Sequence, residues 1–146
     1  MTDLQTKTQN ALDEGRTLIL GAQILLGCLY RSAFEPGYAH FSTTSKCLVA
    51  CALALIILAI VILMAPASYH RIAEQGRDSQ ELNAYVLSIM KVGLVPFALS
   101  IGLSLYIFLN SVLGRAWGII LGVATTILAI FFWYGLRLFY KHRGAH

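Results

Sequence analysis

The chain has 146 residues, of which 58% are hydrophobic and only 12% are charged, and its mean hydropathy is +0.69. Soluble domains carry about twice that share of charged residues, and so short a chain has too little interior to bury this many apolar side chains. The composition therefore excludes a large soluble enzyme or a multidomain regulator, and it predicts a single membrane domain over residues 1–146.

The net charge is +4 and the isoelectric point is about 9.1. In a soluble protein these values would suggest a nucleic-acid partner. Here the basic residues lie at the ends of apolar runs, where lysine and arginine set membrane topology and meet anionic headgroups. We therefore expect membrane lipids, and no nucleic acid, as partners. The cysteines, Cys28, Cys47 and Cys51, are odd in number and lie in apolar stretches, so no disulfide framework is predicted.

Residues 1–10 are polar and lack apolar periodicity, which predicts a short flexible tail. Asn10, followed by Asp13 and Glu14, has the order of an N-cap and an acidic first turn, so a helix is expected from about Ala11. The first membrane span is predicted at about residues 14–34.

An alternative interpretation of this first span is a lipoprotein signal. The segment Leu25-Leu26-Gly27-Cys28 resembles a lipoprotein cleavage box, in which Cys28 would become a lipidated N-terminus. The acidic residues that precede the segment, and the apolar run that continues through Leu29 and Tyr30, favour an intact span.

Three further spans follow. Residues 35–46 combine Pro36 and Gly37 with a Ser/Thr cluster, which predicts a turn followed by a helix cap. The second span is predicted at about residues 47–70, with a kink at Pro66. Asp78 and Glu81 resemble a capping box that opens the third span, at about residues 82–110. Residues 110–115 are a tight connection, and the fourth span covers about residues 116–138.

Basic residues are distributed unequally between the two ends of these spans. Eight lie at the end that holds both termini, and three lie at the other end. The eight are Lys7, Arg16, Arg71, Arg77, Lys91, Arg137, Lys141 and Arg143, and the three are Arg31, Lys46 and Arg115. The positive-inside rule places the richer end in the cytoplasm. The predicted fold is therefore an all-α integral membrane four-helix bundle with short loops and both termini cytoplasmic.

Ionisable residues within a membrane are costly, so they are candidates for function. Most of them here are predicted near one plane, the cytoplasmic edge of the hydrocarbon, and one amide lies deeper. The candidate cluster comprises Glu14, Arg16, Gln23, His70, Arg71 and Lys91. Two interpretations remain open: the charged side chains snorkel outward and set topology, or they face the bundle and bind an anion, a headgroup or a permeating ion.

Helical spacing places Arg16, Gln23, Gly27 and Tyr30 on one face of the first span, within about 40° of Arg16. We expect this face to point into the bundle. Gln23 then either makes an interhelical hydrogen bond worth about 1 kcal/mol or forms a polar step in a translocation path.

Small residues at four-residue spacing form a predicted packing ridge in the fourth span, which would let another helix approach closely. The ridge comprises Gly114, Gly118, Gly122 and Thr126. Its partner could belong to the same chain or to another protomer. Ala98 and Gly102 of the third span are candidates for the receiving groove.

No other site type is indicated. His70 and Glu74 are four residues apart, but two ligands do not make a metal site. No phosphate-binding loop, nucleophile elbow or pair of intramembrane carboxylates occurs in the sequence. We therefore expect no enzyme activity, no cofactor and no metal.

The residues Glu14, Arg16 and Gln23 of the first span, with Pro66 and the pair His70-Arg71 of the second, resemble a bacterial family of small integral membrane proteins known as domain of unknown function 6328. The resemblance covers about residues 12–110. It implies a compact multi-helix membrane fold and points to these positions without naming a reaction. With the charge distribution, it leads us to expect the bacterial inner membrane as the location.

Three hypotheses for function follow. The first is a homo-oligomeric channel or small transporter for an ion or proton, because four short helices enclose little space and conduction would need a subunit interface. The second is an accessory or assembly subunit that docks onto a larger membrane complex. The third is a lipid-interacting membrane scaffold that holds acidic headgroups at its basic edge.

Overall fold

The computed structural model describes residues 3–72 and 80–135, and in this part of the chain it contains helices and no strand. The long helices are α1 (Asp3–Phe34), α2 (Thr43–Ile72), α3 (Gln80–Val112) and α4 (Arg115–Ile130). A short 3-10 helix, η1 (Pro36–His40), follows α1, and a π-helical turn, η2 (Phe131–Gly135), continues α4. The predicted all-α fold is confirmed.

Four segments of these helices are long and apolar enough to cross a membrane. They are Gln9–Phe34, Thr43–Pro66, Ala84–Val112 and Arg115–Gly135. The second is the most apolar, with a mean hydropathy of 3.3. Each overlaps the corresponding predicted span, which supports the interpretation of the chain as a four-span membrane protein.

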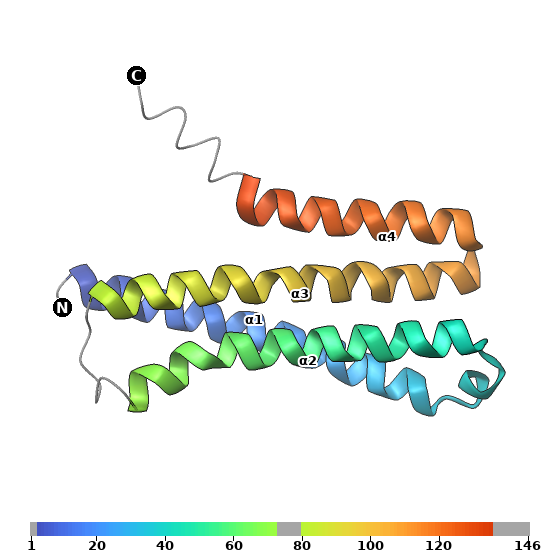
Figure 1. Cartoon of the computed structure of the whole chain (residues 1–146), viewed down its shortest axis with the longest axis horizontal. Coiled ribbons are helices and arrows are strands. Elements are labelled where there is room, and N and C mark those ends of the chain that lie inside the picture. The colour runs from blue at the N-terminus through green and yellow to red at the C-terminus, as the bar shows by residue number, and fades with distance from the viewer. Residues whose placement is uncertain (1–2, 73–79, 136–146) are drawn as a thin grey trace, which may run out of the picture.

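The helices form a three-helix core with a fourth helix at its side (Figure 1). Helices α1, α2 and α3 all pack against one another, whereas α4 packs extensively on α3 alone among the long helices described. The start of α1 and the last turns of α2 lie at the same end of the bundle, whereas η2 ends beside α3 short of that end (Figure 1). The opposite end carries η1 and the turn between α3 and α4.

Small residues occupy the centre of the three-helix core. Ala22 of α1, Ala52 and Ala59 of α2, and Ala98 of α3 are fully buried. Such residues let helix backbones approach closely, which is how helices associate where lipid removes the hydrophobic driving force. Ser100 is the buried polar residue of the described core, and its hydroxyl donates a hydrogen bond to the carbonyl of Ala52 at 3.0 Å.

Helix α1 begins earlier than the sequence predicts. The flexible tail expected at residues 1–10 is wrong for residues 3–10, which are helical, and Asn10 lies inside α1 instead of capping it. Ala11 is buried with Leu63, Val86 and Met90, so tertiary contacts hold this part of α1 against its neighbours. Once a helix is nucleated, each added residue gains one backbone hydrogen bond, and the helix extends beyond the predicted cap.

The other predicted helix boundaries are closer to the observed ones. The Ser42 hydroxyl accepts a hydrogen bond from the backbone N–H of Ser45 at 3.2 Å, so the Ser/Thr cluster caps α2 as expected. Helix α2 runs on through Pro66 to Ile72 and bends in its last turns (Figure 1). The predicted capping residue Asp78 lies outside the described residues.

Beyond α4, the π-helical turn η2 joins the end of the fourth span to α3. The ring of Trp133 stacks on that of Phe97, with 5.8 Å between centroids and 11° between planes. The Tyr134 hydroxyl donates a hydrogen bond to the carbonyl of Lys91. A π-helical turn is rare and rotates the residues that follow it, which here directs two aromatic side chains toward α3.

Candidate functional site

The charged residues predicted near one membrane edge do not form a buried cluster among the described residues. Glu14 and Lys91 are exposed. The side chain of Arg16 is 75% exposed and makes an ion pair with Asp13, one turn earlier, at 2.9 Å. For these three residues, the structure contradicts the interpretation that they face into the bundle. It agrees with the interpretation that their charged side chains snorkel outward. His70 and Arg71 lie in the last turn of α2, but their side chains are outside the described part of the structure.

The polar face of α1 points away from the core, so the expectation that it faces into the bundle of its own chain is wrong. Gln23 and Gly27 are exposed, and Tyr30 is 46% exposed. The face that packs on α2 and α3 instead contains Ala22 and Leu29, seven residues apart. The side of α1 that carries the small residue Ala22 packs closely on its neighbours. Because Gln23 lies about 100° around the helix from Ala22, it is exposed.

The predicted packing ridge of α4 contacts α3 of the same chain. A Cβ atom added at Gly122 would lie 2.8 Å from the carbonyl oxygen of Gly102, and one added at Gly118 would lie 3.1 Å from that of Tyr106. The hydroxyl of Thr126 also faces Gly102 while donating a hydrogen bond to the carbonyl of Gly122 at 3.1 Å. The two backbones therefore approach so closely that no added side chain fits at Gly118 or Gly122.

Two members of the predicted ridge and groove have other roles. Gly114 is not part of the ridge, because it lies in the turn before α4 with a φ of +90°, a conformation that favours glycine. Ala98 is buried in the described core with no exposed surface. Gly102 is thus the receiving residue on α3.

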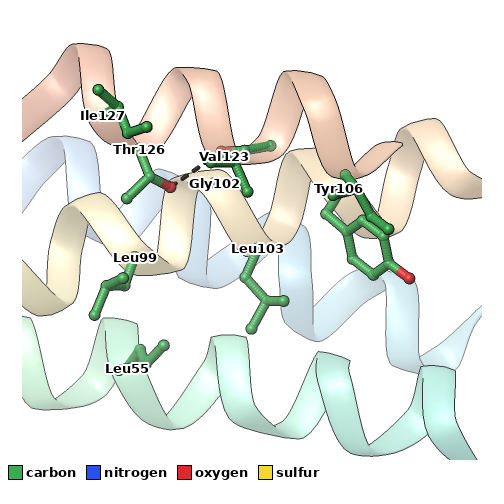
Figure 2. Close-up of a pocket in the computed structure, with 10 residues that line it drawn as sticks. Leu55, Leu99, Gly102, Leu103, Tyr106, Val123, Thr126 and Ile127 are labelled. Carbon is green, nitrogen blue, oxygen red and sulfur yellow. Dashed lines mark hydrogen bonds between the residues drawn. The ribbon is translucent and has the colours of Figure 1, made fainter. Parts of the chain in front are cut away.

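The arrangement of α4 leaves an apolar groove between α2, α3 and α4, with a volume of about 460 Å³. Leu99 and Leu103 point from α3 toward Leu55 of α2, while α4 closes the other side (Figure 2). The full lining comprises Leu55, Leu99, Gly102, Leu103, Tyr106, Ile119, Gly122, Val123, Thr126 and Ile127. The volume lies within the range of small-molecule sites in proteins.

A second pocket of about 180 Å³, called the polar pocket below, lies next to this groove, between the start of α2 and the end of α3, and is lined by polar residues together with Phe41, Leu48 and Ile107. Its polar lining comprises His40, Ser42, Ser45, Tyr106, Asn110 and Ser111. Two of its hydroxyl groups, those of Ser42 and Ser45, lie 3.0 Å apart, and the hydroxyl of Ser111 donates to the carbonyl of Phe108. Tyr106 lines both cavities, so the apolar groove and the polar pocket are neighbours at this residue.

The groove occupies one half of the membrane-spanning region. Along α3 it extends from Leu99 to Tyr106, a distance of about 10 Å along the helix axis, in the half of the span that ends at Val112. One leaflet of a bilayer contributes about 15 Å of hydrocarbon. The groove is thus about two thirds as long as one leaflet is deep, and the polar pocket lies farther toward the end of the bundle that carries η1.

The sequence identifies Gly102, Gly122 and Thr126 only as packing residues, and it does not reveal the other residues of this site. Sequence patterns predict His40 and Asn110 in connections, and Tyr106 in an apolar run. The available signal was the presence of polar groups in both connections predicted at the same end of the bundle. Their meeting depends on the pairing of α2 with α3, which spacing along the chain does not reveal.

No metal centre is indicated in residues 3–72 and 80–135, where no three His, Cys, Asp or Glu residues gather as potential ligands. The exposed Cys28, Cys47 and Cys51 are free thiols.

Comparison with known proteins identifies the family. The sequence profile of a family of unknown function, DUF6328, matches residues 3–137 and so includes the fourth helix as well as the region of resemblance noted above. No curated protein and no solved structure matches the chain.

Proposed function

We propose that this chain, which belongs to the family of unknown function DUF6328, is a non-enzymatic membrane protein that binds one amphiphile from one leaflet of the bilayer. The alkyl chain lies in the groove between α2, α3 and α4, and a headgroup with hydrogen-bonding oxygens, such as a phosphate, occupies the polar pocket. The observation that carries the proposal is an apolar groove within one half of the membrane span that shares a lining residue, Tyr106, with a polar pocket nearer the end of that span.

Physical chemistry supports this pairing of head and tail. An alkyl chain in the groove contacts side chains on three helices, whereas a chain in bulk lipid contacts other mobile chains. Phosphate oxygens accept hydrogen bonds from serine hydroxyls, asparagine amides and histidine. The pocket offers such donors at His40, Asn110 and one of the paired hydroxyls of Ser42 and Ser45, whereas the Ser111 hydroxyl already donates to Phe108. The positive-inside distribution favours the outer side of the membrane for this end of the protein, which supports an amphiphile of the outer leaflet.

Val123→Trp tests the groove by filling it. The wild-type and variant proteins are reconstituted in phosphatidylcholine vesicles that contain traces of a phosphatidylglycerol with a diazirine on its acyl chain. After photolysis we expect labelling of wild-type peptides that contain residues 99–106 and 119–127, and severalfold less in the variant because indole occupies the alkyl site. Mass spectrometry of the peptides measures the change.

Val92→Trp is the matched control. Val92 and Val123 are similarly exposed, at 55% and 53%, but Val92 does not line the groove. Its replacement should leave labelling unchanged. Equal labelling of all exposed apolar helix faces, or equal effects of the two substitutions, would contradict the proposal. A parallel series with a diazirine fatty acid distinguishes a diacyl lipid from a single-chain amphiphile.

Asn110→Leu tests the headgroup pocket. Asn110 is half-buried and lines the pocket, and a hydrogen bond to a charged group contributes about 1.5–3 kcal/mol. We expect the apparent affinity for the phosphatidylglycerol probe to fall about tenfold, with little change for an uncharged diacylglycerol probe. Competition of unlabelled lipid against each probe gives the affinities. A similar loss for both probes would argue against a role in headgroup recognition.

The channel or transporter hypothesis receives less support. The described core of one chain contains a single buried polar residue, Ser100, and its hydroxyl is bonded to the backbone. A polar path would therefore need an interface between protomers, where the exposed face of α1 could contribute Arg16 and Gln23. Ion or proton flux into vesicles that contain purified protein tests this alternative.

A further inference from the structure

The exposed face of α1 has the spacing of a coiled-coil seam. Its residues recur at alternating intervals of four and three, as the a and d positions of a heptad do. They are Arg16, Leu20, Gln23, Gly27, Tyr30 and Phe34. Leu20 is 61% exposed and Phe34 is 83% exposed, and a Cβ added at Gly27 would meet nothing within 4 Å. In the described structure, this seam is therefore not covered by the rest of its own chain.

Gln23 lies on this seam at a depth where an uncovered amide is unfavourable. Arg16 lies at one membrane edge and Phe34 at the other. Along the helix axis, Gln23 is about 10 Å from Arg16 and about 16 Å from Phe34. Its side chain is too short to reach either surface. It has no hydrogen-bond partner among the described residues. A carboxamide that faces lipid has neither water nor protein to bond with.

We infer that the α1 seam binds the α1 seam of a second copy of this chain, with the two Gln23 side chains hydrogen-bonded to each other. Two copies inserted with the same topology are related by a twofold axis along the membrane normal, so their α1 helices run parallel and each residue meets itself at the same depth. A carboxamide has both donors and an acceptor and is therefore complementary to its own copy.

The rest of the seam fits this arrangement. Gly27, one turn from Gln23, has no side chain and allows the two backbones to approach. At the membrane edge, the carboxylate of Asp13 accepts a hydrogen bond from Arg16 at 2.9 Å, which reduces repulsion between the two arginines of a pair. Gln23 is the one amide of the seam, and a polar residue at such a position also fixes the register and favours a dimer. The seam lies on α1, which does not line the amphiphile groove, so this interface is independent of the proposed function.

The first test measures the oligomeric state of Gln23 variants. In mild detergent and in lipid nanodiscs, light scattering should show a dimer for the wild type and for Gln23→Asn, which keeps the amide. Gln23→Leu should dissociate about ten times more readily. Because Gln23 is exposed within a single chain, the circular dichroism spectrum of Gln23→Leu should match that of the wild type. A wild-type monomer in both media, or an equally stable dimer without the amide, would overturn the inference.

The second test uses disulfide cross-linking to locate the interface. In a background with Cys28, Cys47 and Cys51 replaced by serine, Phe34→Cys introduces a thiol on the seam, and restoring Cys28 introduces an exposed thiol on another face of α1. Oxidation in membranes should cross-link the Phe34→Cys chain into a covalent dimer and leave the Cys28 chain monomeric. The reverse result, or equal cross-linking at both positions, would exclude the α1 seam.

Discussion

Gly102→Ala is expected to lower the free energy of unfolding by about 3 kcal/mol, as overpacking of a tight contact does. The new methyl group would lie 1.8 Å from the Thr126 hydroxyl oxygen and 2.7 Å from the Gly122 carbonyl oxygen. Rotating Thr126 relieves the first contact but breaks its bond to Gly122. The second contact is with backbone, so α4 must move. Detergent-based unfolding followed by circular dichroism measures the loss.

Gly15→Ala is the matched control for this substitution. Gly15 lies within α1, and a Cβ added there would meet nothing within 4 Å. Alanine has a higher helix propensity than glycine by about 1 kcal/mol, so the control should be neutral or stabilising. Thr126→Ala should rescue Gly102→Ala only partly, because the clash with the Gly122 carbonyl remains. Equal stabilities of the two glycine variants would show that α3 and α4 are not in the described contact.

Phe97→Ala is expected to lower the free energy of unfolding by about 3 kcal/mol, as removal of a buried aromatic ring does. Phe97 is 8% exposed, belongs to the core formed by α1, α2 and α3, and stacks on Trp133 of η2. Its loss leaves a cavity in the core and removes a contact that joins η2 to α3. The same unfolding assay measures stability, and a shift in tryptophan emission reports the loss of the stacked ring.

Phe108→Ala, which removes an exposed aromatic ring from the same helix, α3, is the control for Phe97→Ala. Phe108 is 62% exposed, and lipid chains replace its contacts when the ring is removed. We expect no measurable change in stability. A large loss at both positions would place Phe108 in a contact between protomers, whereas no loss at Phe97 would contradict the described core.

The membrane-spanning segments followed from local composition. The span that begins at Thr43 has a mean hydropathy of 3.3, and a strongly apolar stretch of that length must be helical within a bilayer to satisfy its backbone hydrogen bonds. The Ser42 cap and the small residues of α4 were also visible in the sequence, since both depend on residue type and short spacing. The early start of α1 was not visible, because it depends on contacts that bury Ala11.

The orientation of α1 illustrates what local sequence does not reveal in a membrane protein. In water, the apolar side of a helix identifies its core face. In lipid, both sides of a helix are apolar, and close packing between backbones decides which side is covered. Ala22 marks the packed face of α1, whereas the more conspicuous Gln23 lies exposed.

The sequence by itself determined a four-span α-helical membrane protein, the approximate limits of its spans and the glycine positions at which two helices meet. These properties depend on hydropathy, length and side-chain volume, which each segment carries alone. Only the tertiary structure decided that α4 packs on α3 beside the core, that this leaves a groove next to Leu55, and that His40 and Asn110 line one pocket at its end. Those features depend on which helices are neighbours, and without a hydrophobic driving force between helices the choice of neighbour comes from the fit of whole helix surfaces.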